Sequence, residues 1–236
     1  MATTIVDGFE DGFYTYNGEG EMTCPMGWFP VWVDDPRDGV LDRPEWKPAG
    51  TAQVRTGTGA VAIHSRYSTI DGALVRTYEV EPGSELTASV WMLKTEDASG
   101  HSMQIGIDPT GGTLITSGNV VWSEWYSQHM PDYAVNKWRP RTVEAVAESN
   151  LITVFLRSKV DVAVNSSNAH FDDFALTVDE PETEPEPEPE PEPDATYTVD
   201  VPINGTARVT LSIDLEVVDA EFIPAAPNLL QRILGR

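Results

Sequence analysis

The 236-residue sequence predicts an all-β protein with a jelly-roll β-sandwich head, an extended Glu-Pro spacer, and a small C-terminal β-hairpin plus short helix. Three observations predict this fold class. Short runs rich in β-branched and aromatic residues alternate with Gly, Pro, Asp and Asn turns, which is typical of sandwiches and jelly rolls. No run in the head has an apolar stripe with the 3.6-residue helical period. Residues 182–193 alternate Glu and Pro almost throughout, and such a segment holds no core.

The Glu-Pro segment sets the domain boundaries. Proline fixes φ near −65° and the glutamates repel one another, so we expect a stiff spacer roughly 35–40 Å long. Residues 1–180 form the predicted head, which is long enough to bury a core unaided. Residues 181–194 form the acidic linker, and residues 195–236 form an attachment or oligomerisation segment.

The head contains eight predicted strands, each bounded by turn residues. In chain order they are 5–10, 61–65, 73–80, 86–93, 103–107, 141–147, 151–157 and 171–178. Asn150 separates two of them, which predicts a tight hairpin there. Residues 11–50 show no sustained period and are expected to form a long irregular loop.

The composition excludes several function classes. A formal charge of −23 argues against nucleic acid and against an anionic membrane surface, since both would repel the chain. No apolar run reaches the length of a membrane helix, and the N-terminal residues lack the pattern of a signal peptide. Cys24 is the single cysteine, so it forms no intramolecular disulfide and is expected to be buried.

Five short motifs carry a family resemblance. They are Gly8-Phe9-Glu10, the Gly-Ile-Asp-Pro-Thr-Gly-Gly run at 106–112, Val121-Trp122-Ser123, Thr153-Val154-Phe155-Leu156, and Phe171-Asp172-Asp173-Phe174. With them, residues 5–178 resemble galactose-binding-like jelly rolls of the carbohydrate-binding-module type. The resemblance implies a jelly-roll fold and sugar binding, although fold by itself does not name a ligand.

The resemblance also implies a structural Ca²⁺ site. It places the first and last strands side by side, which would bring Glu10 close to Asp172 and Asp173. Carboxylates that converge repel unless a cation lies between them, and Ca²⁺ prefers oxygen ligands. Alternation along the strand predicts that only one of the two aspartates faces this site. The alternative is an acidic sheet edge that discourages strand pairing.

Aromatic residues in the two long loops suggest a glycan site. Indole rings stack on the C–H faces of sugars, and charged side chains bind their hydroxyls. The predicted glycan-binding residues are Trp32, Arg43, Glu45 and Trp46 from the first loop, and Trp122, Trp125 and Tyr126 from the second. For any one of these aromatics, packing in the core is an equal alternative, but we expect at least one to be exposed for binding.

No catalytic constellation accompanies these residues. The strands lack paired acids at alternate positions, and the sequence contains no His-Glu-x-x-His or Gly-x-Ser-x-Gly motif. The sequence therefore predicts a non-enzymatic protein.

The C-terminal segment, residues 195–236, is expected to bind a partner. Asn204-Gly205 favours a hairpin turn, residues 209–217 present an apolar face, and residues 229–234 are expected to form a short helix. Such a segment would join a protein assembly or self-associate, and the alternative is an independent mini-domain.

These features predict a carbohydrate-binding adhesion module on the extracellular face of a virion or cell assembly, whose partner is a cell-surface or polymeric carbohydrate. The alternative is a structural decoration protein without a sugar ligand, and a weaker one is an ancillary domain of a secreted glycan-active enzyme.

Overall fold

The computed structural model describes residues 2–34, 43–95, 101–163 and 166–181, together with two short strands near the C-terminus. The chain divides into two compact units, Met1–Glu182 and Thr183–Arg236. The spacer predicted at 182–193 and the helix predicted at 229–234 lie outside the described residues.

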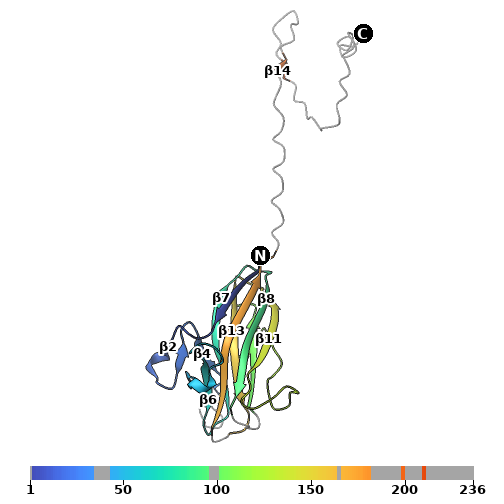
Figure 1. The fold of residues 1–236 in the computed structure, drawn as a ribbon. Coiled ribbons are helices and arrows are strands. Elements are labelled where there is room, and N and C mark those ends of the chain that lie inside the picture. Colours follow the sequence, from blue (N-terminus) through green and yellow to red (C-terminus); the bar gives the residue numbers. More distant parts are fainter. Residues whose placement is uncertain are drawn as a thin grey trace, which may run out of the picture. The chain divides into compact units, whose positions relative to one another are not determined.

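The first unit is a β-sandwich of the jelly-roll type, built from two antiparallel sheets (Figure 1). The first sheet has the order β11 (Arg139–Val146), β8 (Glu85–Lys94), β13 (Ser167–Asp179), β6 (Val61–Ser65), β5 (Glu45–Pro48), with β1 (Ala2–Asp7) also paired to β13. The second sheet has the order β10 (Val121–Trp122), β9 (His101–Asp108), β12 (Leu151–Val160), β7 (Ile70–Glu79), β4 (Phe29–Trp32). A small ribbon joins β2 (Phe13–Thr15) to β3 (Thr23–Pro25).

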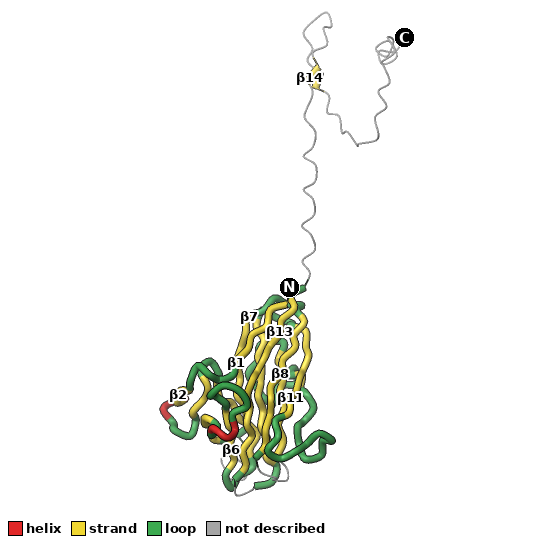
Figure 2. The backbone as a smooth tube through the Cα atoms, viewed as in Figure 1, coloured by secondary structure: helices red, strands yellow, loops and turns green. Residues whose placement is uncertain are grey.

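Strand alternation builds the core between the sheets. On β12, Ile152, Val154 and Leu156 are buried in the main core, whereas Phe155 belongs to a second apolar cluster on the outer face of the same sheet. This is the period-2 pattern of a pleated strand. The only helical segments among the described residues are two 3₁₀ turns, Tyr16–Gly18 and Thr51–Gln53, drawn red in Figure 2. Cys24 is buried as expected, and burial raises the pKa of its thiol to about 12, so it is not a reactive thiolate.

The order of the sheets confirms the central topological expectation. β1 and β13 are antiparallel neighbours, from Ala2 opposite Asp179 to Asp7 opposite Phe174, and Figure 1 shows them side by side. All eight predicted strands are present, with ends shifted by a few residues.

Two sequence-based predictions are wrong. The first long loop contains β2, β3, β4 and β5, which are only three or four residues long, so no period marks them. Three of them, β3, β4 and β5, also contain Pro. The hairpin at Asn150 is absent, because β11 lies in the first sheet and β12 in the second. The connection at Asn150 crosses from one sheet to the other.

In the second unit, β14 (Thr198–Val199) pairs antiparallel with β15 (Val209–Thr210). This pairing agrees with the predicted hairpin, while the turn and most of the apolar face lie outside the described residues. Within the part of the chain that is described, no helix is long and apolar enough to cross a membrane.

Candidate functional site

The predicted metal ligands meet one loop, residues 55–59, at the end of β1. The Glu10 carboxylate accepts hydrogen bonds from the Thr58 amide at 2.9 and 3.1 Å, the Thr58 hydroxyl at 2.6 Å and the Gly59 amide at 2.9 Å. Gly57 adopts φ +63°, and a Cβ there would lie 2.1 Å from Glu10 Oε1. The loop can therefore fold over Glu10 only because this position is glycine.

Both aspartates of β13 hold the same loop. Asp172 accepts from the amides of Arg55 at 2.7 Å and Thr56 at 3.3 Å, and Asp173 binds the Arg55 guanidinium and the Thr56 hydroxyl. The pairing of β13 with β8 shifts register between Asp172 and Ala175, and Asp173 adopts φ +47°. This bulge breaks the alternation, so the prediction that only one aspartate faces the corner is wrong.

Hydrogen bonds from the 55–59 loop occupy these carboxylates. Their oxygens already accept from N–H and O–H groups, and Arg55 supplies the positive charge. The described ranges contain no group of three or more His, Cys, Asp or Glu side chains that could hold a metal. Ca²⁺ takes six to eight oxygen ligands, so a cation here would compete with these hydrogen bonds. Calcium as a structural cofactor stays a prediction.

Glu10 should make the head sensitive to acid. The hydrogen bonds from Thr58 and Gly59 hold the pKa of Glu10 below its ordinary value of 4.5. A lowered carboxyl pKa means that the unfolded chain binds more protons, so stability from Glu10 is present above about pH 4.5 and is lost as pH falls through the folded pKa. Asp172 works in the opposite sense, because burial raises its pKa. We expect Glu10→Gln to flatten the loss of stability on acidification.

Urea unfolding of the head at several pH values between about 3 and 7 measures this slope. Glu85→Gln, which removes an exposed carboxylate at the end of β8, is the matched control. Equal slopes for Glu10→Gln and the wild type would contradict the role of Glu10. The same urea titrations in chelator and in excess Ca²⁺ test the calcium prediction. Unchanged curves would contradict a structural Ca²⁺ site, and a chelator-dependent loss of stability would support one.

Two predicted aromatics, Trp122 and Trp125, come together on the outer face of the second sheet. The Arg157 guanidinium carbon lies 5.0 Å from the ring centroid of Trp122 and 5.2 Å from that of Trp125. Arg157 is fixed by Asp71 on the neighbouring strand, through bonds of 2.7 Å from Nε and 2.6 Å from Nη2. Both indoles are partly exposed. We call Trp122, Trp125, Arg157 and Asp71 the tryptophan platform.

The backbone makes room for this platform. Trp122 lies opposite Gly106 on β9, and a Cβ at Gly106 would be 2.4 Å from the Trp122 ring. The Trp122 ring also packs 5.6 Å from Phe155. Only glycine at position 106 leaves room for the indole to pack directly against the backbone of β9.

An apolar hollow occupies the same sheet face. A cavity of about 340 Å³ is lined by residues 30–33, which include the predicted ligand Trp32, and by residues 113–116. Val31, Val33, Ile115 and Trp122 belong to one apolar cluster around Phe155. The platform therefore continues into an apolar surface along β4.

The remaining predicted glycan ligands lie elsewhere. Trp46 and Tyr126 are 0% exposed, so no sugar can stack on them, and their prediction as ligands is wrong. Trp46 packs against Trp32 at 5.9 Å, and Tyr126 packs against Tyr133 at 5.6 Å.

The charged residues of the first loop also miss the platform. Arg43 pairs with Glu19 and Glu21, and Glu45 lies in the first sheet, 3.8 Å from His64. Sequence reasoning missed Arg157 and Asp71. The available signal was a charged residue at an outward position of an otherwise apolar strand.

Comparison with solved structures shows that this chain is similar in fold to several known domains. No protein-family model matches the sequence, and no curated protein does. The CBM22-1 xylan-binding domain of Xyn10C from Paenibacillus barcinonensis shares 11% identity at a TM-score of 0.45, covering 75% of this chain and 94% of that one. The K3 adhesin domain of Lys-gingipain from Porphyromonas gingivalis shares 15% at a TM-score of 0.46, covering 75% and 99%.

A family 61 carbohydrate-binding module, solved with β-1,4-galactotriose, shares 12% identity at a TM-score of 0.42, covering 64% of this chain and 88% of that one. The likeness concerns the fold alone.

Proposed function

We propose that the head is a non-catalytic carbohydrate-binding domain that takes its ligand on the tryptophan platform. The observation that carries this proposal is the pair of partly exposed indoles, Trp122 and Trp125, both within about 5 Å of the ion-paired Arg157 guanidinium. The indoles offer apolar faces for pyranose C–H groups, and the planar Arg157–Asp71 pair offers donors and acceptors for hydroxyls.

The platform favours binding over catalysis. Asp71, the carboxylate beside the two tryptophans, binds Arg157 through both oxygens. A carboxylate held in this way is not free to act as a general acid or base toward a glycosidic bond.

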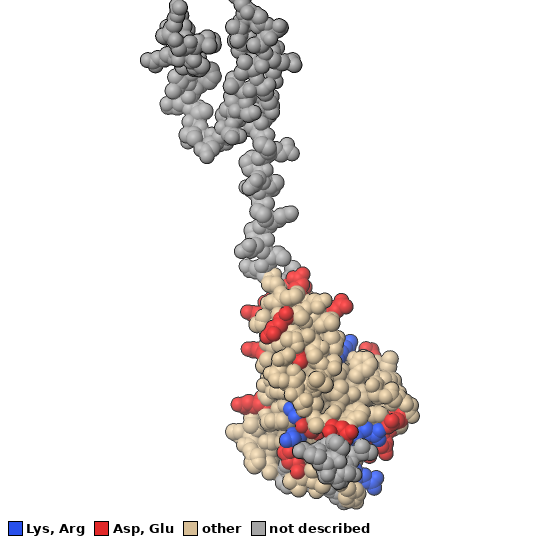
Figure 3. Space-filling view, turned by 180° about the vertical axis from the view of Figure 1, so that it is seen from behind, with Lys and Arg blue, Asp and Glu red and all other residues tan. Residues whose placement is uncertain are grey.

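The charge of the head favours a neutral ligand. On the face drawn in Figure 3, acidic side chains are spread over the described head, and most of the Lys and Arg side chains lie among further acidic ones in its lower half. Such a surface repels polyanions such as sulfated or sialylated glycans at low salt. Neutral oligosaccharides are therefore the proposed class.

The wider setting is also a proposal. We propose that residues 195–236 attach the head to a protein assembly or to further copies of the chain, which would display it on the extracellular face of a virion or cell assembly. It rests on the apolar alternation at 209–217 and on the acidic linker. Sedimentation of the full chain tests this step, and a clean monomer that attaches to no particle would overturn it.

Trp122→Ala and Trp125→Ala are each expected to weaken binding by about 2 kcal/mol, or roughly 30-fold, because each removes an aromatic stacking surface. Isothermal titration calorimetry with neutral xylo-, gluco-, galacto- and manno-oligosaccharides measures the effect. Tyr67→Ala, which removes an exposed aromatic from another loop, is the matched control and should leave affinity unchanged. If both tryptophan variants stay folded and bind as tightly as the wild type, the platform is not the binding site.

A further inference from the structure

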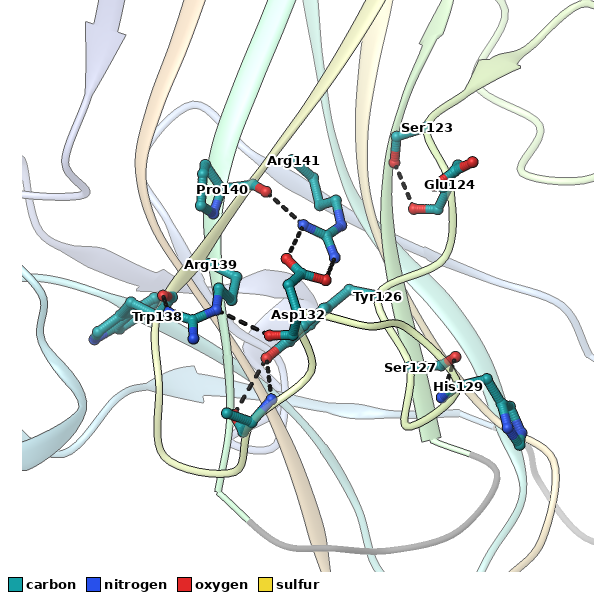
Figure 4. Close-up of polar contacts among 11 residues, drawn as sticks. Ser123, Glu124, Tyr126, Ser127, His129, Asp132, Trp138, Arg139, Pro140 and Arg141 are labelled. Atoms are coloured by element: carbon teal, nitrogen blue, oxygen red, sulfur yellow. Dashed lines mark hydrogen bonds and ion pairs between the residues drawn. The ribbon is translucent and has the colours of Figure 1, made fainter.

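A second hollow lies at the edge of the sandwich, beside the platform. It has a volume of about 520 Å³ and opens between β11 and the segment that follows β10. Its polar lining comes from Ser123, Glu124, Asp132, Arg141 and Thr142, and its apolar lining comes from Met130 and Pro131. Figure 4 shows Ser123 and Glu124 on one side and the Asp132–Arg141 pair facing them. We call this hollow the edge groove.

The Asp132–Arg141 pair is held rigidly. The Arg141 Nη1 atom lies 3.0 Å from Asp132 Oδ2, and Nη2 lies 2.9 Å from Oδ1 (Figure 4). Nη1 also donates to the Pro140 carbonyl at 2.8 Å, and the guanidinium lies 4.8 Å from the Tyr126 ring centroid. The hydrogen bonds from Arg141 hold the pKa of Asp132 below its ordinary value, so the pair is ionised at neutral pH. A fixed bidentate pair presents a planar, neutral row of donors and acceptors.

Glu124 adds a free acceptor. Its side chain is exposed, and within the described ranges its carboxylate makes no hydrogen bond or ion pair. With Asp132 neutralised by Arg141, the groove carries one net negative charge. This charge disfavours anionic ligands, while Met130 and Pro131 supply an apolar wall for the C–H face of a sugar ring.

The edge groove and the platform are built on one segment. Trp122 and Trp125 flank Ser123 and Glu124 in the sequence, and the Ser123 amide donates to the Ile105 carbonyl at 2.8 Å, which continues the pairing with β9. The indoles lie on the outer face of the sheet, and the groove lies at its edge. The two sites therefore meet at residues 122–125, which contribute side chains to both.

We infer that the edge groove is a second subsite, which binds the continuing sugar units of an extended neutral glycan whose first units lie on the tryptophan platform. The inference rests on the proposed function. It predicts that the head distinguishes chain length: a disaccharide fits on the platform alone, whereas a longer chain can turn over the Ser123–Glu124 edge and engage both sites.

The test compares oligosaccharides of two and six units, from the same four neutral series, by calorimetry on the full chain. The double variant Glu124→Ala/Met130→Ala is expected to weaken hexasaccharide binding about 10-fold and to leave disaccharide binding unchanged. Glu144→Ala is the matched control, because it removes an exposed carboxylate from β11, the strand that lines the groove with Arg141 and Thr142, at a position outside the groove. Urea midpoints show whether each variant is folded.

The outcomes separate the two proposals. If Trp122→Ala weakens both lengths and the groove variant weakens neither, the subsite is overturned and the proposed function stands. If the groove variant weakens both lengths equally while Trp122→Ala has no effect, the platform assignment fails and the subsite order inferred here fails with it. If the wild type binds no member of the four series, the proposed function is contradicted.

Discussion

Replacing Trp46 with alanine is expected to lower the free energy of unfolding of the head by about 3–5 kcal/mol, the usual cost of removing a large buried aromatic. Trp46 is 0% exposed and packs against Trp32, and its amide donates to the Glu21 carbonyl at 2.8 Å. It therefore joins β5 and the first loop to the core. Its removal leaves a cavity that the two sheets, each held by hydrogen bonds between its own strands, cannot close fully.

Urea denaturation measures this loss, and Trp125→Ala is the matched control because it removes the same side chain from the surface. We expect the control to shift the midpoint far less. The remaining folded Trp46→Ala protein should bind its oligosaccharide with wild-type affinity. An unchanged urea midpoint together with weakened sugar binding would show that Trp46 contacts the ligand, and would contradict its burial.

Asp7→Ala is expected to destabilise the head by about 3 kcal/mol or more, because it leaves a buried donor and a guanidinium without their acceptor. Asp7 is 11% exposed and accepts three hydrogen bonds of 2.8 Å, from the Phe9 amide, the Trp28 indole and Arg76. Trp28 in turn packs edge-on against Phe174 at 5.2 Å. Asp7 thus ties β1 to the aromatic core and to β7.

A double-mutant cycle with Arg76→Met separates the ion pair from the other two bonds. Since Arg76 is one-third exposed, water recovers part of its solvation, and the pair itself should account for the smaller share. The Trp28 indole is fully buried, so water cannot replace the acceptor that its N–H loses. A loss below about 1 kcal/mol for Asp7→Ala would show that the three bonds contribute little to stability.

The fold class and most of the strands follow from local sequence patterns. Alternation of apolar and polar residues is a local property, and Gly, Pro and Asn mark the turns that interrupt it. A strand such as residues 151–157 can therefore be predicted from the sequence. The family resemblance carried by the motifs at the two ends of the head implied that the first and last strands are neighbours, and β1 and β13 are. The short strands of the first loop gave no such signal, since three or four residues contain too few alternations to show a period.

Strand pairing, which local patterns do not reveal, selects the aromatics that line a surface. Trp122 and Tyr126 lie four residues apart in one loop, yet Trp122 pairs opposite Gly106 and lies on the outer face, whereas Tyr126 pairs opposite Met103 and points into the core. Register along β9 fixes these directions, and a shift of one residue would reverse them.

Long-range partners were decided in the same way. Arg157 meets Asp71 across 86 residues because β12 and β7 are neighbours in the second sheet. The bulge between Asp172 and Ala175 turns both acidic residues toward one loop, against the alternation that the sequence displays. Local pattern determines which residues form strands, but pairing and register, which depend on packing across the whole sandwich, determine which side chains meet.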